Sequence, residues 1–556
     1  MQSVIYIVKK LSLKNYILLA ILVLFALLLF KNPYSTRNLI SNLEPYPDTI
    51  HYLAPAINFT HGKGFYIERE GRASSPNVPL LYSVSLMPAF IFTSDPRAFY
   101  FVNIFLSLLS LYFLYRICAI LFKNIYISLL VMFFYVTNYF VYWYPNLAMA
   151  ENLLIPLYLG GIWILLEKVS ARNIVIASFI LVGLYATKYA AIPLSASLFL
   201  LYLIKVLKSK VSSKKTASAT FLVASALVFT AFALFEYFSK GFNIFNSVLS
   251  LYNLLFSGFI STTPSDTGEI VSSNPWFSTR YMPGNINIYF DALTGSPMRF
   301  LWDYTPIVPK YVGIFSLAGL IYGLFKKKFR FISFSLLLLI FSQIIFMSTF
   351  YSVDARYIYH VIPTLLIGFG LFLAFAYDFL IAQNKKYAKI LFGLILVGLS
   401  LVYLSGNAVR IKSQVSINLR YAENPWYYIS VVEQNKYFDS IPQKDNKPIL
   451  ISALPPYYVD FFSGNRYRLL PLSKGQEYQK GMSNVWGDQD YTDLIVLYKN
   501  YLEKGEEVYV ANYGLGNEAH LHRDFSKIKD QFNLELVHKA CFDVCNIYKV
   551  HLKDDN

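Results

Sequence analysis

The stretch YSVDARYIYHVIPTLLIGFGLFLAFAYDFLIAQNKK, residues 351–386, shows most clearly how this chain folds. Residues 357–381 form a nearly uninterrupted apolar run, which is long enough to cross a hydrocarbon core about 30 Å thick as a helix. Asp354 and Arg356 precede the run, and lysines follow it. The pattern predicts a membrane-spanning helix with reactive side chains at one face of the bilayer and basic anchors at the other.

The whole chain shares this apolar character. Of its 556 residues, 56% are hydrophobic, 18% aromatic and only 15% charged, whereas soluble domains are about 25% charged. A soluble body of this size needs more polar surface, so we expect most of the chain to lie in lipid. The same figures exclude disordered, collagen-like and coiled-coil proteins.

The net charge of +16 at first suggests a nucleic-acid partner, but the position of the charge argues against one. Nineteen of the 49 cations lie in six short segments between apolar runs, with Glu167 as the single acid among them. The remaining 30 cations face 32 acids. The basic excess is therefore confined to alternate loops, which the positive-inside rule assigns to the cytoplasmic side. We expect no nucleic-acid partner.

Eleven apolar runs are candidate spans of an α-helical polytopic membrane protein. With the N-terminus in the cytoplasm, every basic cluster lies inside and the C-terminus lies outside, as expected for a multi-pass plasma-membrane protein. The runs are 14–30, 98–121, 125–142, 152–167, 173–188, 189–205, 217–238, 307–325, 331–350, 357–381 and 390–406.

The predicted domains are a membrane domain, residues 1–406, and an extracytoplasmic domain, residues 407–556. The membrane domain has two large outer loops, 31–97 and 239–306; the second is either a lid over the acceptor or a plain connector. The tail alternates strand-like and helix-like runs: the strands are expected at 447–454, 507–513, 534–540 and 546–552, and the helices at 491–505 and 523–532. It is therefore expected to be a small α/β domain.

The first outer loop contains the first candidate catalytic residue, Asp48. Pro47 directly before it suits the start of a helix, where the positive end of the helix dipole stabilises a carboxylate. An apolar stripe with helical spacing follows, and a glycine pair ends it. His51 and Tyr52 lie on the same predicted helix. The alternative for Asp48 is a simple helix cap, and Glu44 and His51 are the other candidates for its catalytic role. Farther on, the proline-interrupted run SVSLMPAFIF (83–92) is too short to span and predicts an interfacial helix.

Two further candidates stand at the outer ends of spans. Glu151 lies among apolar residues after the third span, where an acid costs free energy unless it faces a cavity or a partner. Lys188 is the one cation in the outer turn between the fifth and sixth spans. The alternatives are a loop acid facing water and a lysine that extends to the membrane surface. Tyr142, Trp143 and Tyr144, before Glu151, suggest an interfacial aromatic belt, with stacking against a sugar as the alternative.

Arg356 completes the set at the mouth of the tenth span. Arginine suits bidentate contact with phosphate, and helical spacing would place Arg356 and His360 on one face. The alternative is an internal ion pair of Arg356 with Asp354 or Glu151. Two acids and two cations meeting in one outer-leaflet cavity suit a lipid-phosphate donor. The cations hold the leaving phosphate, and a carboxylate accepts the proton of an acceptor hydroxyl.

The order of these features resembles the GT-C glycosyltransferases, in particular the branch with protein O-mannosyltransferases and the aminoarabinose transferase of lipid A. The resemblance covers about residues 14–380. It rests on five features in this order: Asp48 followed by Y-x-x-x-A (52–56), P-x-x-P-L-L-Y (76–82), Glu151 after the third span, T-K (187–188) and D-A-R-Y (354–357). It implies Asp48 and Glu151 as catalytic residues. It also implies Lys188 and Arg356 near the donor phosphate.

Tyr357, His360, His51 and Tyr52 are the further candidate substrate contacts. The resemblance implies an inverting enzyme. Such an enzyme moves a sugar from a polyprenyl-phosphate donor to a protein, glycolipid or polysaccharide acceptor outside the cytoplasm, among membrane lipids. Two departures stand out: Thr49 follows Asp48 where the family often has a second acid, and Ala150-Glu151-Asn152 replaces S-E-P. Two well-placed acids favour a metal-independent reaction with no cofactor, over one that needs a divalent metal.

Two other functions remain open at this point. A transporter or lipid flippase would carry ionisable residues deep in its spans, and here the span centres are nearly free of charge. A membrane-anchored binding protein would work through its tail, and the α/β pattern permits that.

Overall fold

The structure is a computed structural model. It describes residues 12–34, 47–69, 72–74, 76, 78–209, 213–240, 279–300, 303–350, 352–383, 385–420, 430–442, 446–453, 456–463, 466–473, 494–512, 515, 519–539 and 546–553.

The chain divides into two compact units. The first comprises Met1–Pro33, Val78–Ile244 and Phe277–Ala422, and the second comprises Tyr34–Asn77, Phe245–Trp276 and Glu423–Asn556. The first outer loop therefore contributes to both units. The domain boundary expected between residues 406 and 407 stays a prediction.

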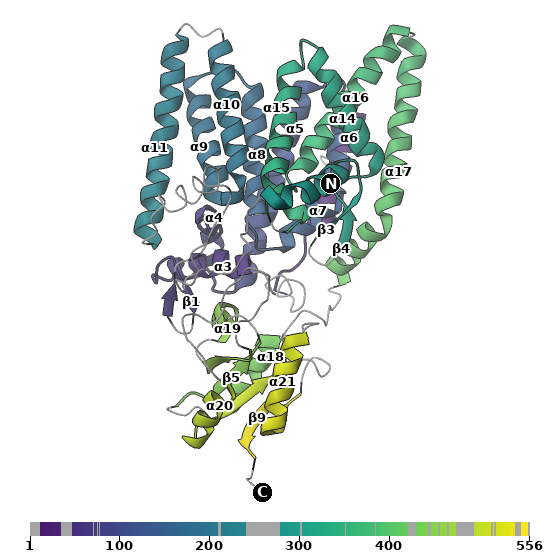
Figure 1. The fold of residues 1–556 in the computed structure, drawn as a ribbon. Coiled ribbons are helices and arrows are strands. Elements are labelled where there is room, and N and C mark those ends of the chain that lie inside the picture. The colour runs from purple at the N-terminus through teal and green to yellow at the C-terminus, as the bar shows by residue number, and fades with distance from the viewer. Residues whose placement is uncertain are drawn as a thin grey trace, which may run out of the picture. The chain divides into compact units, whose positions relative to one another are not determined.

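The first unit is built almost entirely of helices. Figure 1 shows α9, α10 and α11 packed side by side, and α14 packed along α16. Its helices are α2 (Leu13–Leu29), α4 (Leu81–Phe90), α5 (Phe99–Leu121), α6 (Ile125–Val136), α7 (Tyr139–Trp143), α8 (Glu151–Leu166), α9 (Ala171–Thr187), α10 (Ile192–Lys208), α11 (Lys214–Lys240), α13 (Met282–Leu293), α14 (Lys310–Phe325), α15 (Arg330–Ser348), α16 (Val361–Gln383) and α17 (Lys385–Arg420). A short hairpin, β3 (Pro297–Phe300) and β4 (Asp303–Pro306), precedes α14.

Each of the eleven predicted spans coincides with a helix or a bent pair of helices. Among the described residues, six helices are long and apolar enough to cross a membrane, and a seventh span results if α6 and the bent segment after it are one element. The other four predicted spans correspond to the shorter apolar helices α2, α8, α9 and α14. The expected interfacial helix is α4, which has 10 residues. The polytopic helical fold is confirmed.

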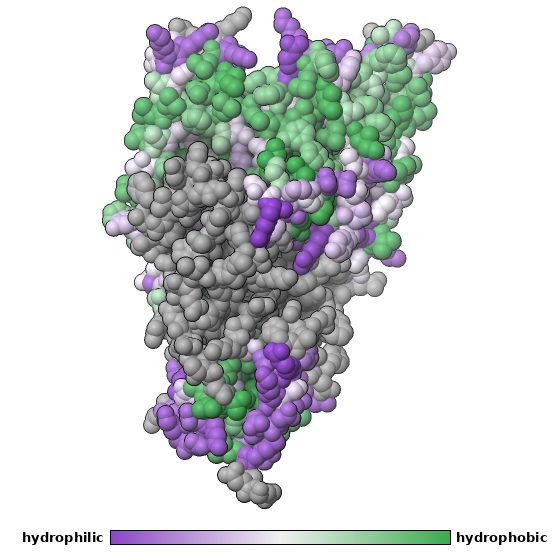
Figure 2. Space-filling model, viewed as in Figure 1, coloured by the Kyte–Doolittle hydropathy of each residue, from purple (hydrophilic) through white to green (hydrophobic). Residues whose placement is uncertain are grey.

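The sides of these helices suit lipid. Figure 2 shows hydrophobic residues along the helices and hydrophilic residues gathered at helix ends. Only 6% of the most apolar window of α11 is buried within the protein, and 17% of that of α17. Large apolar side chains such as Leu227 and Leu394 are therefore exposed, which costs free energy in water but none in hydrocarbon. The chain is a multi-pass membrane protein.

Small residues allow one helix pair to pack very closely. A Cβ added at Gly319 of α14 would lie 2.2 Å from the carbonyl oxygen of Gly368 on α16, so only glycine permits this approach. Close backbone contact between small residues is a common basis of helix association in membranes. This contact holds α14 against the N-terminal half of α16.

The tail forms a five-stranded mixed sheet in the second unit. Its order is β6-β5-β7-β9-β8; β5 pairs in parallel with β6 and β7, and β9 pairs antiparallel with β7 and β8. The elements are α18 (Ser430–Ser440), β5 (Ile449–Ser452), α19 (Pro456–Ser463), β6 (Arg468–Pro471), α20 (Leu494–Glu503), β7 (Val508–Ala511), α21 (Ala519–Gln531), β8 (Phe532–His538) and β9 (Ile547–Leu552).

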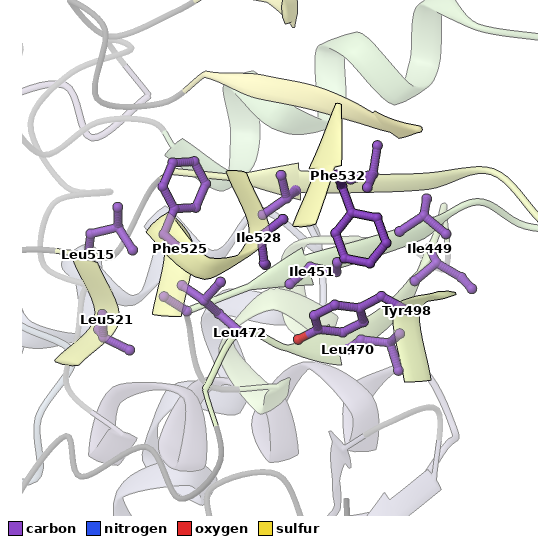
Figure 3. Close-up of a cluster of buried hydrophobic side chains, with 14 residues drawn as sticks. Ile449, Ile451, Leu470, Leu472, Tyr498, Leu515, Leu521, Phe525, Ile528 and Phe532 are labelled. Carbon is purple, nitrogen blue, oxygen red and sulfur yellow. The ribbon is translucent and has the colours of Figure 1, made fainter. Parts of the chain in front are cut away.

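A continuous apolar core supports this sheet. Ile451 and Val510 from the central strands pack with Tyr498 of α20 and Phe525 of α21 (Figure 3). Four expected strands and two expected helices are present, so the predicted α/β domain is confirmed; β6, α18 and α19 are additional.

The first-loop part of the second unit contains the predicted helix. It is α3 (Pro47–Thr60), and it starts at the proline that the sequence singles out. Gly62 and Gly64 follow with positive φ of 75° and 97° and end it, as expected. Two short antiparallel strands follow, β1 (Ile67–Arg69) and β2 (Arg72–Ser74). Helix α3 packs against β1, and α19 of the tail packs against both.

Candidate active site

Helix α8 begins at Glu151, the first residue of its first turn. The turn before it is closed by Asn152, whose Nδ2 donates to the carbonyl oxygens of Leu147 at 2.8 Å and Met149 at 3.0 Å. This fixes the helix start. The Glu151 side chain is only 1% exposed, and it lies at the helix end where the dipole favours negative charge.

Lys188 supplies the opposite charge from the end of α9. It is the C-cap of that helix with extended backbone angles, φ −156° and ψ 124°, and it leads into the short helix η4 (Tyr189–Ala191). Its Nζ lies 2.5 Å from Oε1 of Glu151, and its side chain is 15% exposed. Oε2 of Glu151 is buried and accepts no hydrogen bond from the described residues. The pair is therefore buried, with one carboxylate oxygen left over.

Arg356 and Tyr357 come from a turn that precedes α16. Asp354 caps the short helix η6 (Ala355–Tyr357) by accepting from the backbone N–H of Arg356 at 2.9 Å. The Arg356 guanidinium carbon lies 4.8 Å from the Tyr357 ring centre, and Nη2 donates to the Tyr357 hydroxyl at 2.8 Å. Nζ of Lys188 lies 5.5 Å from the same ring centre. One tyrosine ring thus contacts both predicted phosphate-binding cations.

Gln343 of α15 joins the two turns that carry these cations. Its Nε2 donates to the carbonyl oxygen of Ala190 at 3.1 Å and, more weakly, to that of Tyr357 at 3.4 Å. The sequence analysis missed Gln343, because it lies inside an apolar span and has no distinctive neighbours. Its position fixes η4 relative to η6, and so Lys188 relative to Arg356.

His360 lies at the start of α16 and is 1% exposed. The Tyr158 ring meets it edge-on at 5.2 Å, and the Tyr158 hydroxyl bonds to that of Thr364 at 2.6 Å. Nε2 of His360 is buried with no hydrogen-bond partner among the described residues. The expected helical face shared by Arg356 and His360 is wrong. The cap at Asp354 makes η6 instead, and α16 starts only at Val361.

The predicted aromatic belt before Glu151 is also wrong for two of its members. Tyr142 of α7 and Tyr144 directly after it are fully buried, in the segment that follows a 57° bend at the end of α6. The Tyr144 ring stacks on that of Tyr359 at 4.6 Å. Tyr289 of α13 was missed as well. Burial raises its pKa, as does the negative charge that nearby Tyr357 and Asp354 can carry. Tyr144, Tyr359 and Tyr289 lie near the group of charged residues, whereas Tyr142 lies near Tyr139 and Arg410.

A second buried acid stands beside the same turn. Glu236 of α11 is fully buried; it accepts from the backbone N–H of Leu80 at 3.1 Å and, weakly, from the Tyr189 hydroxyl at 3.5 Å. It thereby links the P-x-x-P-L-L-Y segment to the residue after Lys188.

The first unit brings together Glu151, Lys188, Arg356, Tyr357 and His360, which come from three separate segments between positions 151 and 360 of the sequence. The structure places these five residues but does not test their roles. His51 and Tyr52 lie buried on α3 in the second unit. Asp48 is on the same helix, and its side chain lies outside the described part of the chain.

No three His, Cys, Asp or Glu side chains within the described ranges lie close enough together to hold a metal ion. What the first-unit cluster offers is two cations around one ring beside a buried carboxylate. Such a cluster can hold an anion with several oxygen acceptors, such as a phosphate.

Comparison by sequence, with family models and with curated proteins, finds no match. Comparison by structure does. ArnT from Cupriavidus metallidurans bound to undecaprenyl phosphate matches with a TM-score of 0.59 and 11% identity, covering 97% of this chain and 98% of that one. Its apo state matches with a TM-score of 0.57 and 12% identity, covering 96% and 97%.

The chain has the GT-C fold. A second match with this fold is the oligosaccharyltransferase of Archaeoglobus fulgidus, with a TM-score of 0.51 and 12% identity. That match covers 95% of this chain and 73% of the other. The likeness extends over nearly the whole chain, whereas the resemblance seen in the sequence ended near residue 380. At these identities the shared property is the GT-C fold itself.

Proposed function

We propose that this chain is an inverting membrane glycosyltransferase, which moves a sugar from a polyprenyl-phosphate carrier to an acceptor outside the cytoplasm. The observation that carries the proposal is the placement of Lys188 and Arg356 around one Tyr357 ring, beside buried Glu151. The GT-C fold supports it, because one of the matched structures holds undecaprenyl phosphate.

The two cations are the proposed phosphate site. Each lies within 6 Å of the same ring centre, and the proposal is that one phosphate group contacts both. Glu151 pairs with Lys188, and Arg356 adds a second cation beside the same ring. Charge-assisted bonds to a phosphate oxygen are each worth roughly 1.5–3 kcal/mol. As the sugar leaves, the carrier phosphate gains negative charge, and these bonds strengthen at that moment.

Asp48 is the proposed general base. It accepts the proton of the acceptor hydroxyl while the oxygen attacks the anomeric carbon of the sugar. The bond from that carbon to the phosphate oxygen breaks, and the electron pair leaves with the carrier phosphate. Attack from the face opposite the leaving group inverts the anomeric centre. A positioned general base contributes about 10²–10⁴ in rate.

Glu151 has the proposed second role of holding Lys188 toward the donor. Its free oxygen leaves room for one more donor, such as a sugar hydroxyl. His360, with its open ring nitrogen, and His51 and Tyr52 of the first outer loop are the other proposed substrate contacts. The proposed reaction uses no metal and no cofactor.

The proposed orientation places the N-terminus in the cytoplasm and the tail outside, with the donor entering sideways from the bilayer. The acceptor is a protein, a glycolipid or a polysaccharide; the tethered acceptor peptide of the archaeal oligosaccharyltransferase supports the first class.

Mass spectrometry of products tests the proposal. The purified chain is incubated with several polyprenyl-phosphate sugars and with peptide, glycolipid and glycan acceptors. We expect one donor to give a product heavier by one sugar, and Asp48→Asn to reduce turnover by two orders of magnitude or more. Flux of the carrier lipid across proteoliposomes without any covalent product would favour a flippase instead.

A further inference from the structure

A long apolar groove lies between α2, α6 and α17, which pack against one another. Its volume is about 1,050 Å³. The walls are almost wholly aliphatic and aromatic, with Leu24, Phe133 and Leu401 at the deep end. Three polar residues, Lys123, Asn124 and Lys389, line the other end. Ser400 is the polar residue near the deep end, and its hydroxyl donates to the carbonyl oxygen of Leu396 on its own helix.

The depth of the groove matches one leaflet. Along α17 it runs from Lys389 to Leu401, twelve residues or about 18 Å at 1.5 Å per residue. Half of a typical hydrocarbon core is about 15 Å. An occupant with its head at the two lysines therefore ends near the bilayer midplane.

The groove is separate from the candidate active site. Lys123 follows the C-terminal end of α5, where Arg116 pairs with Glu167 after the last residue of α8. Glu151 is the first residue of α8, so the lysine end of the groove and the Glu151–Lys188 pair lie at opposite ends of the helices. The cationic mouth faces the other membrane surface.

We propose that this groove binds one anionic phospholipid, with an acyl chain between α2, α6 and α17 and its phosphate between Lys123 and Lys389. An apolar groove one leaflet deep fits an acyl chain, and two exposed lysines at its mouth complement a negative headgroup. The lipid completes the packing of α17, most of whose surface is open.

A substitution that fills the groove tests whether the acyl chain of the lipid binds there. Gly393 lines it, and a Cβ there meets nothing within 4 Å. Gly398 on the same helix is equally open and is not part of the lining. Native mass spectrometry of the full chain, released from nanodiscs of phosphatidylglycerol and phosphatidylcholine, counts retained lipid. Gly393→Leu should lose one tightly held phosphatidylglycerol and Gly398→Leu should keep it. Equal retention by the two variants would overturn the proposal.

Removing the two positive charges at the mouth of the groove tests whether the lipid headgroup binds there. Two lysines near an anionic group favour it by up to about thirtyfold. Replacing Lys123 and Lys389 by Gln should therefore reduce the preference for phosphatidylglycerol over phosphatidylcholine by up to that factor. The matched control replaces Lys214 and Lys215, two exposed lysines at the start of α11, by Gln and should leave it unchanged. Equal effects of the two double variants would contradict the proposal. So would displacement of the retained lipid by an equal concentration of undecaprenyl phosphate.

Discussion

Glu151→Gln should destabilise the helical unit far more than an ordinary surface charge change. Removing one partner of a buried ion pair typically costs about 3–5 kcal/mol, because the other charge stays buried without compensation. Glu151 is 1% and Lys188 15% exposed, so solvent screens the pair little. Lys188 keeps its contact with the Tyr357 ring, worth roughly 0.5–2 kcal/mol. We therefore expect a loss of about 1–4.5 kcal/mol.

The assay is the temperature at which half of the purified protein stays monodisperse after heating, measured by fluorescence-detected gel filtration. The double variant Glu151→Gln/Lys188→Met should recover part of the loss of each single variant, since it removes both charges together. The control is Glu167→Gln, which alters the more exposed pair with Arg116 at 3.6 Å and should cost about 1 kcal/mol or less. A Glu151 variant no less stable than the Glu167 variant would refute a buried, coupled pair.

Three further predictions concern the active site and the packing. Tyr357→Leu should lower kcat/KM for sugar transfer about tenfold, whereas Tyr357→Phe, which keeps the ring beside both cations, should cost only a few-fold. Gly319→Ala should lower the half-inactivation temperature by several degrees, because its methyl group would overlap the carbonyl of Gly368, while Gly398→Ala in open surroundings should not. Ile451→Ala, in the fully buried core of the sheet, should cost about 2–5 kcal/mol and speed proteolysis of the tail in the full chain by tenfold or more; unchanged cleavage would contradict the packing in Figure 3.

Hydropathy predicted the helices because each span is an apolar run bounded by polar or charged residues. Hydropathy did not predict the parts of helices that are polar and extend beyond an apolar run. Helix α17 runs to Arg420 although the predicted span ends at 406, since the polar residues after Gly406 keep helical geometry outside the apolar run. Strand β6 was missed because RLLP is too short to show alternation.

The charged residues of the candidate site could be predicted because acids and cations are rare at the predicted outer ends of the spans. Their geometry could not. The sequence offered Arg356 as an ion-pair partner of Glu151, whereas the structure pairs Glu151 with Lys188. That choice depends on how α8, α9 and η6 pack against one another. Gln343 and Tyr289 act through contacts between distant elements, which leave no local pattern in the sequence.

The central claim is that Arg356 and Lys188 hold the phosphate of a polyprenyl carrier. The most direct test measures the binding of undecaprenyl phosphate to the detergent-purified wild-type chain and to Arg356→Gln. The control variant is Arg330→Gln, an exposed position at the N-terminal end of α15. The account predicts that Arg356→Gln weakens binding at least tenfold and that Arg330→Gln leaves it unchanged. Equal affinities for the wild type and Arg356→Gln would contradict it.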